Sequence, residues 1–144
     1  MDDIGSELSA KNIVVIEATE IAGGSSGKAG GLLASWATPS CLAPLSFELH
    51  AELAEKYNGI LEWVIVVFTA PISPTIRKHA EGEEIGPIVG GVPGVTGLWV
   101  ATGHDEWGVQ NSLGTGKILA GMVMRDELEG VDVKALDPRN FIRE

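Results

Sequence analysis

The sequence has little cysteine, few basic residues and no long hydrophobic run. A single cysteine among 144 residues excludes a disulfide within the chain and fits a reducing compartment. Lysine and arginine together number 10, against 20 aspartates and glutamates, which gives a net charge of −10. Because nucleic acids and anionic membranes are bound by clustered basic side chains, we expect neither as a partner.

No apolar segment is long enough to cross a bilayer. The candidate, residues 60–72, is interrupted by Glu62, whereas a membrane-spanning helix needs about 20 apolar residues. The acidic first residues contain no apolar segment before Ile13 that could act as a signal peptide. These absences predict a cytoplasmic protein.

The composition that remains is that of one glycine-rich globular domain. The chain is 44% hydrophobic and 21% charged, and a chain of this length can bury one core but not two. Its 19 glycines exceed the usual share of about 7%, which fits either a loop-rich ligand scaffold or a poorly specified chain. We therefore predict a single domain over residues 1–144, with a loose lead-in at 1–10 and a charged connection at 60–84.

The clearest pattern lies between Gly97 and Met124. An apolar run at 97–102 predicts a strand, a glycine-rich loop follows, and apolar residues at helical spacing predict a helix near 115–128. This unit presents free backbone N–H groups and a positive helix end, so it predicts a cradle for an anion or a cofactor. It is neither a P-loop nor a dinucleotide fingerprint, because Asn111 and Leu119 stand where those motifs need glycine.

A second glycine-rich segment follows an apolar run near the N-terminus. Residues 13–16 are all β-branched, which is typical of a strand covered on both faces, and Glu17 follows them. An acid at this point holds ribose hydroxyls in dinucleotide-binding folds, although a carboxylate simply leaving a sheet edge is the alternative. Residues 23–31 hold five glycines, two serines and one lysine, a set that would suit a pyrophosphate or a flavin edge.

Three further elements complete the prediction. We expect strands near 64–68 and 86–90 and an amphipathic helix near 45–57. Histidines are few, and no set of residues predicts a metal site or a nucleophile–base pair. The polar run 104–106 is interpreted as a loop beside a pocket. The catalytic residues are left unassigned.

The sequence motifs of both glycine-rich segments resemble those of one protein family. Gly97-Leu-Trp-Val-Ala-Thr-Gly-His104, then Trp107-Gly-Val-Gln-Asn111 and Gly114-Thr-Gly-Lys117, resembles the C-terminal signature of the D-amino-acid-oxidase-like FAD-dependent oxidoreductases. Residues 13–33 are similar to that family's second FAD-binding segment, and 131–141 are similar to its tail. The resemblance covers about 11–59 and 85–141 and lapses between them.

The resemblance implies an α/β protein with a partial Rossmann-like FAD-binding fold, in which helices flank a small, mostly parallel sheet. It implies FAD as cofactor and a small amine or amino acid as substrate. The cofactor-binding residues expected from the motifs and loops are Glu17, Ala18, Ser25, Ser26, Gly27, Lys28, Ala29, Gly30, Gly31, Gly103, His104, Trp107, Gly108, Val109, Gln110, Gly114, Thr115 and Gly116.

Two parts of the family pattern are missing from this sequence. The first is the opening unit with its Gly-x-Gly-x-x-Gly loop, and the second is most of the substrate domain. We therefore interpret the chain as a shortened member with impaired or no catalysis. The alternative is a non-catalytic remnant that binds a nucleotide weakly or a protein partner.

The missing unit leads to two structural expectations. We expect 13–17 and 98–101 to share a sheet, directly or through 64–68, because a vacant central position would leave backbone groups unpaired. We also expect the two glycine loops, 25–31 and 103–116, to converge on one cleft, since loops leave a parallel sheet at its carboxyl edge. Glu17 would lie at one end of the cleft and the helix that starts near Gly116 at the other.

Overall fold

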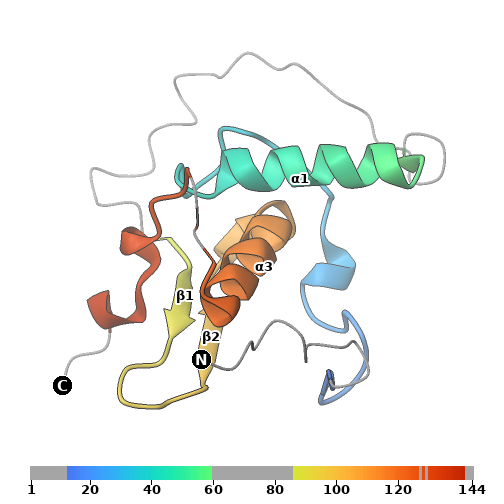
Figure 1. Cartoon of the computed structure of the whole chain (residues 1–144). Coiled ribbons are helices and arrows are strands. Elements are labelled where there is room, and N and C mark those ends of the chain that lie inside the picture. Colours follow the sequence, from blue (N-terminus) through green and yellow to red (C-terminus); the bar gives the residue numbers. More distant parts are fainter. Residues whose placement is uncertain (1–12, 60–85, 127, 129, 142–144) are drawn as a thin grey trace.

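The structure, a computed structural model, describes residues 13–59, 86–126, 128 and 130–141. Two helices and two strands form its regular part: α1 (Ala43–Lys56), β1 (Ile88–Gly91), β2 (Trp99–Thr102) and α3 (Gly108–Met124). Short 3₁₀ turns lie before, between and after them (Figure 1). The lead-in expected at 1–10, the strand expected at 64–68 and the connection expected at 60–84 lie outside the described residues.

The two helices are in direct contact, and the contact depends on a glycine. A Cβ atom added to Gly114 of α3 would lie 2.8 Å from Leu42 Cδ1 and 3.0 Å from Ser46 Cβ. The Ser46 hydroxyl donates to the Gln110 carbonyl at 2.5 Å and accepts from the Gly114 N–H at 3.0 Å. Because Gly114 has no side chain, α1 can approach closely enough for the Ser46 hydroxyl to hydrogen-bond with the backbone of α3.

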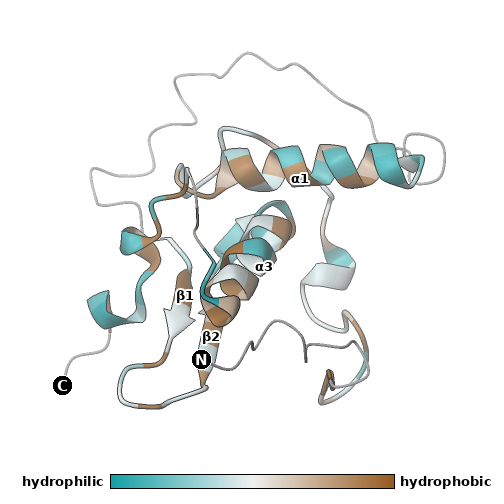
Figure 2. Cartoon of the chain, in the orientation of Figure 1, coloured by the Kyte–Doolittle hydropathy of each residue, from teal (hydrophilic) through white to brown (hydrophobic). Residues whose placement is uncertain are grey.

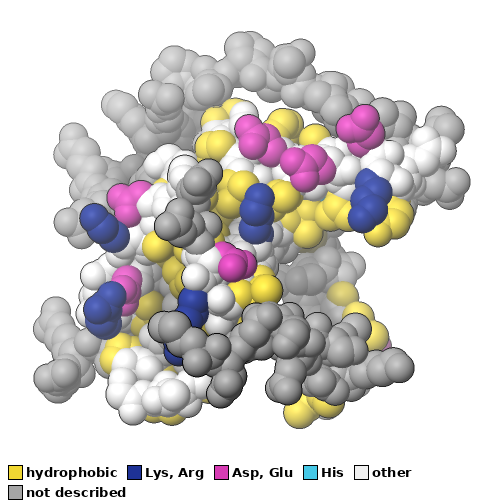
Figure 3. Space-filling view, in the orientation of Figure 1, with side chains coloured by type: hydrophobic (Ala, Val, Ile, Leu, Met, Phe, Trp, Pro, Cys, Tyr) yellow, Lys and Arg dark blue, Asp and Glu magenta, His cyan; other side chains and the backbone are white. Residues whose placement is uncertain are grey.

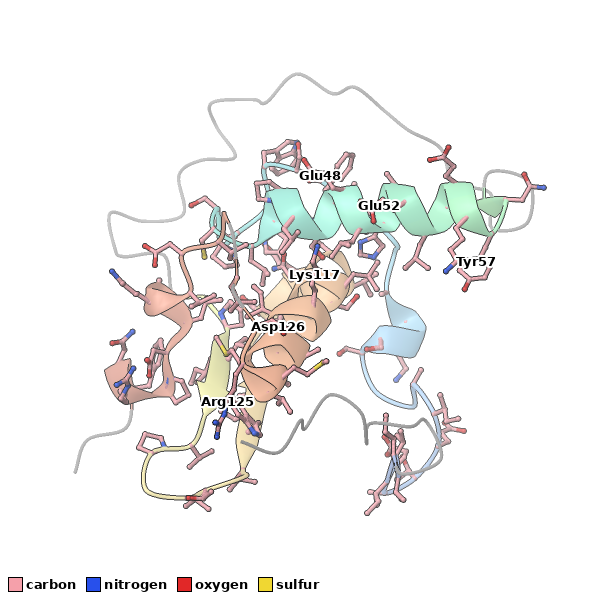
Figure 4. All side chains as sticks on the ribbon, in the orientation of Figure 1. Glu48, Glu52, Tyr57, Lys117, Arg125 and Asp126 are labelled. Carbon is pink, nitrogen blue, oxygen red and sulfur yellow. The ribbon has the colours of Figure 1, made fainter. Side chains whose placement is uncertain are left out.

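The core lies where α1, α3, β1 and the C-terminal tail meet. Leu42, Val89, Ile118 and Leu136 form one fully buried cluster. Apolar residues of α1 gather near its N-terminal half, while its C-terminal end is hydrophilic (Figure 2). Acidic side chains gather over α1 on the face shown in Figure 3, and Figure 4 labels two of them, Glu48 and Glu52. None of the helices in the described ranges is long and apolar enough to cross a membrane.

The predicted fold class, an α/β fold with a small, mostly parallel sheet, is wrong. The described sheet has two antiparallel strands, β1 and β2, with Val89 opposite Ala101 and Gly90 opposite Val100. The strands are consecutive, and only residues 92–98 join them. A connection this short allows an antiparallel hairpin, whereas a parallel pair needs a crossover of a dozen or more residues.

The expected strand at 13–17 is also wrong. These residues belong to no strand, and the side chains of Ile13 to Ile16 are 63–89% exposed. The sheet expected to include 13–17 and 98–101 therefore does not form, and the segment lies apart from β1 and β2 in Figure 1. A β-branched run favours extended backbone, but a strand also needs a neighbour that satisfies its hydrogen bonds and covers its side chains.

The helix expected near 115–128 begins earlier, at Gly108, and ends at Met124. Its first residues were interpreted as loop because they contain several glycines, each of which costs a helix about 1 kcal/mol relative to alanine. Packing against α1 offsets this cost at Gly114. The residue after the helix, Arg125, is its C-cap and adopts a left-handed conformation at φ 62°. The helix expected at 45–57 and the strands expected near 86–90 and 97–102 are present with shifted ends.

Candidate functional site

A cavity of about 500 Å³ lies between the two glycine-rich segments. Ser25, Ser26 and residues 29–32 line it from the first segment, and residues 105–110, where α3 begins, line it from the second. Trp36 completes the lining. Two loops that are far apart in the sequence thus meet at one site of ligand-binding size.

The expected site residues divide into two groups. Nine line the cavity: Ser25, Ser26, Ala29, Gly30, Gly31, Trp107, Gly108, Val109 and Gln110. Nine do not: Glu17, Ala18, Gly27, Lys28, Gly103, His104, Gly114, Thr115 and Gly116.

Glu17 and the helix start occupy positions different from those expected. The Glu17 carboxylate accepts from the Thr19 N–H at 3.0 Å in an exposed local turn. The start of α3 is Gly108 rather than Gly116, and its first residues, 108–110, line the cavity. Gly114 packs against α1, which makes its role one of helix packing.

Four lining residues were not identified as site residues from the sequence: Leu32, Trp36, Asp105 and Glu106. The polar run 104–106 had been interpreted as a loop beside a pocket, and the structure places two of its members in the lining. Trp36 follows the apolar run that begins at Leu32. The sequence indicates Trp36 only as an aromatic residue soon after a glycine loop. Such a residue can line a cavity or belong to the hydrophobic core, and the sequence does not distinguish the two.

Gln110 holds the two sides of the cavity together. Its side-chain Oε1 accepts from the Ala34 N–H at 2.6 Å, and its Nε2 donates to the Ala43 carbonyl at 3.1 Å. The residue is fully buried. One amide therefore joins three segments: the chain after the first glycine loop, the start of α1 and the start of α3.

Two tryptophans form an aromatic corner of the cavity. The rings of Trp36 and Trp107 pack edge to face, with centroids 5.8 Å apart and planes at 81°. They rest on a small buried cluster of Ala34, Ala37 and Ala43. This support fixes the corner, because each indole packs against residues that are themselves buried.

The described residues contain no group of three or more histidine, cysteine or acidic side chains that could hold a metal ion. His50 lies on α1, and its Nδ1 is 2.7 Å from the Ser46 carbonyl oxygen. It does not line the cavity. No nucleophile–base pair lines the cavity among the residues that the structure describes.

His104 is expected to make stability depend on pH. Its Nε2 lies 2.9 Å from the Thr115 hydroxyl, and burial lowers the pKa of its imidazole below the usual 6.5. The folded state therefore binds a proton less readily than the unfolded state. The contribution of His104 to the stability of the folded state is therefore fully present above pH 6.5. It is lost as the pH falls through the lowered folded-state pKa.

Urea denaturation of wild type and His104→Gln at about pH 7.5 and about pH 5.5 measures this effect. Wild type should lose more stability on acidification than the variant, since glutamine does not titrate. An equal loss in both proteins would assign the pH dependence to other groups.

Part of the chain is similar to two yeast proteins. Over 55 residues it is 58% identical to a Saccharomyces cerevisiae protein named "Putative oxidoreductase TDA3", a match that covers 38% of this chain and 10% of that protein. Over 54 residues it is 44% identical to a Schizosaccharomyces pombe protein named "Putative oxidoreductase C1F5.03c", which covers 35% of this chain and 14% of that protein. The chain thus matches a small fraction of the length of these relatives. No family model and no solved structure matches it.

These matches relate the chain, over part of its length, to proteins named as oxidoreductases.

Proposed function

We propose that this chain forms part of a flavin-dependent oxidoreductase of the D-amino-acid-oxidase-like type, and that its cavity holds the flavin ring. The observation that carries the proposal is that both segments resembling the family's FAD-binding motifs line the same cavity. The names of the two relatives support the general class of reaction. The resemblance further suggests a small amine or amino acid as substrate.

The cavity fits the ring of the cofactor better than its pyrophosphate. A Cβ atom added at Gly30 or Gly31 would meet nothing within 4 Å, so the backbone there is open to a flat ligand. The volume of about 500 Å³ lies within the range of small-molecule sites. In contrast, no lysine or arginine is among the lining residues, while Asp105 and Glu106 are. Two carboxylates oppose the close approach of phosphate groups.

The residues of this chain would bind and orient the ring. The hydroxyls of Ser25 and Ser26 can donate to ring carbonyls and nitrogens, while Trp36 provides an apolar surface. Gln110 fixes the distance between the two sides. The flavin, when bound, would accept the hydride from the substrate. The chain's contribution is the orientation of the ring.

Titration with FAD tests the proposal, with flavin absorbance and fluorescence as readout. We expect weak but saturable binding, because the cavity lacks a cationic partner for the pyrophosphate. Gly30→Leu should weaken it at least severalfold, since it adds a bulky side chain to a residue that lines the cavity. Gly24→Leu is the matched control: its site is equally open but does not line the cavity.

Absence of any flavin binding to the folded protein would reject the proposal and favour a non-catalytic remnant. Equal binding by both glycine variants would place the flavin elsewhere.

A further inference from the structure

The charge of the cavity selects against anions. Asp105 and Glu106 line it and no basic side chain does. The N-terminus of α3 at Gly108 opposes this with a dipole charge of roughly +0.5. The carboxylate of Asp105 carries a larger charge than the partial charge of one helix end. This carboxylate outweighs the helix dipole, and the field in the cavity is negative.

The aromatic corner adds a second preference. Trp36 and Trp107 present indole rings at nearly a right angle, 81°, in the lining of the same cavity. The face of an indole ring attracts a cation electrostatically, and alkylated ammonium groups are bound by such aromatic walls because they are weakly hydrated. Indole faces next to carboxylates are a set of groups that recognises an organic cation rather than an inorganic one.

We propose that the cavity binds a quaternary or alkylated ammonium group, with its methyl groups against Trp36 and Trp107 and its charge near Asp105. This inference goes beyond the proposed function, because it rests on the charge and aromatic lining of the cavity and requires no flavin. Neither Ser25 nor Ser26 opposes it, since a hydroxyl oxygen can face a cation.

Calorimetric titration of the flavin-free protein with choline tests the proposal. The comparison ligand is the neutral isostere of choline, in which carbon replaces the nitrogen, because it has the same shape without the charge. Choline should bind measurably more tightly, by about two- to fivefold for a partly exposed site. Equal affinity for the two ligands, or no binding of either, would overturn the proposal.

Two pairs of variants locate the binding. Asp105→Asn should weaken choline binding about two- to fivefold, while Asp126→Asn, which follows the C-terminal end of α3 and does not line the cavity, should not. Trp36→Leu should remove the preference for choline over its isostere, while Trp99→Leu on β2 should keep it. If Trp36→Leu fails to fold, the exposed Asp105 position decides, since its variant removes only a charge. Unchanged binding in Asp105→Asn would overturn the proposal.

The same titrations separate this inference from the proposed function. Choline binding without FAD binding would support the inference and reject the flavin proposal. FAD binding without choline binding would do the reverse. If both bind, choline should compete with FAD, because the two ligands are assigned to the same cavity; simultaneous binding without competition would overturn the assignment of choline to it.

Discussion

Replacing Gly114 with alanine should destabilise the protein by roughly 1–2 kcal/mol, even though alanine is the better helix former. The added Cβ would lie 2.8 Å from Leu42 Cδ1, 3.0 Å from Ser46 Cβ and 3.4 Å from the Leu42 carbonyl. Leu42 is fully buried, so its side chain cannot turn away freely. Overpacking of this kind typically costs about 1–3 kcal/mol, and the gain in helix propensity returns at most about 1 kcal/mol.

Gly116 offers a matched control on the same helix. A Cβ atom there would meet nothing within 4 Å, so Gly116→Ala should gain about 0.5–1 kcal/mol from the reduced backbone entropy of the unfolded chain. Urea denaturation of the two variants should therefore give changes of opposite sign. If Gly114→Ala were as stable as Gly116→Ala, the close approach of α1 to α3 would be contradicted.

The glycines show what the sequence could and could not predict. A glycine that admits a ligand and a glycine that admits a neighbouring helix both require the absence of a Cβ atom. Local sequence therefore pointed equally to Gly30, which lines the cavity, and to Gly114, which contacts α1. The distinction depends on the tertiary contact with Leu42, which lies far away in the sequence.

The strands show the same limit. The positions of β1 and β2 were visible as short apolar runs bounded by glycine, and the short connection 92–98 already required antiparallel pairing. The resemblance to a FAD-binding fold predicts parallel strands, whereas the short connection predicts an antiparallel pair, and the structure has the antiparallel pair. Residues 13–16 have the composition of a buried strand, yet they are exposed. The composition of a segment indicates which backbone conformation it favours, but a strand forms only where a neighbouring strand accepts its hydrogen bonds.

The most damaging single change to the site should be Gln110→Leu. Leucine has a similar size but cannot bond to the Ala34 N–H or the Ala43 carbonyl, which Gln110 contacts at 2.6 and 3.1 Å. The Ala43 carbonyl keeps its bond within α1, but the buried Ala34 N–H would lose its partner. An unsatisfied buried polar group costs about 1–3 kcal/mol, so the variant should be destabilised by roughly that amount. Because Gln110 joins both sides of the cavity, ligand binding should weaken along with stability.

Ser112→Ala is the control for this prediction. Ser112 is exposed on the same turn of α3, and its hydroxyl donates only to the Val109 carbonyl of its own helix, at 2.8 Å. Its loss should change the free energy of unfolding by no more than about 0.5 kcal/mol. Urea denaturation gives the stability of both variants, and hydrogen exchange at the Ala34 amide gives the local effect. A Gln110→Leu variant with wild-type stability and a protected Ala34 amide would show that the buried amide does not hold the two segments together.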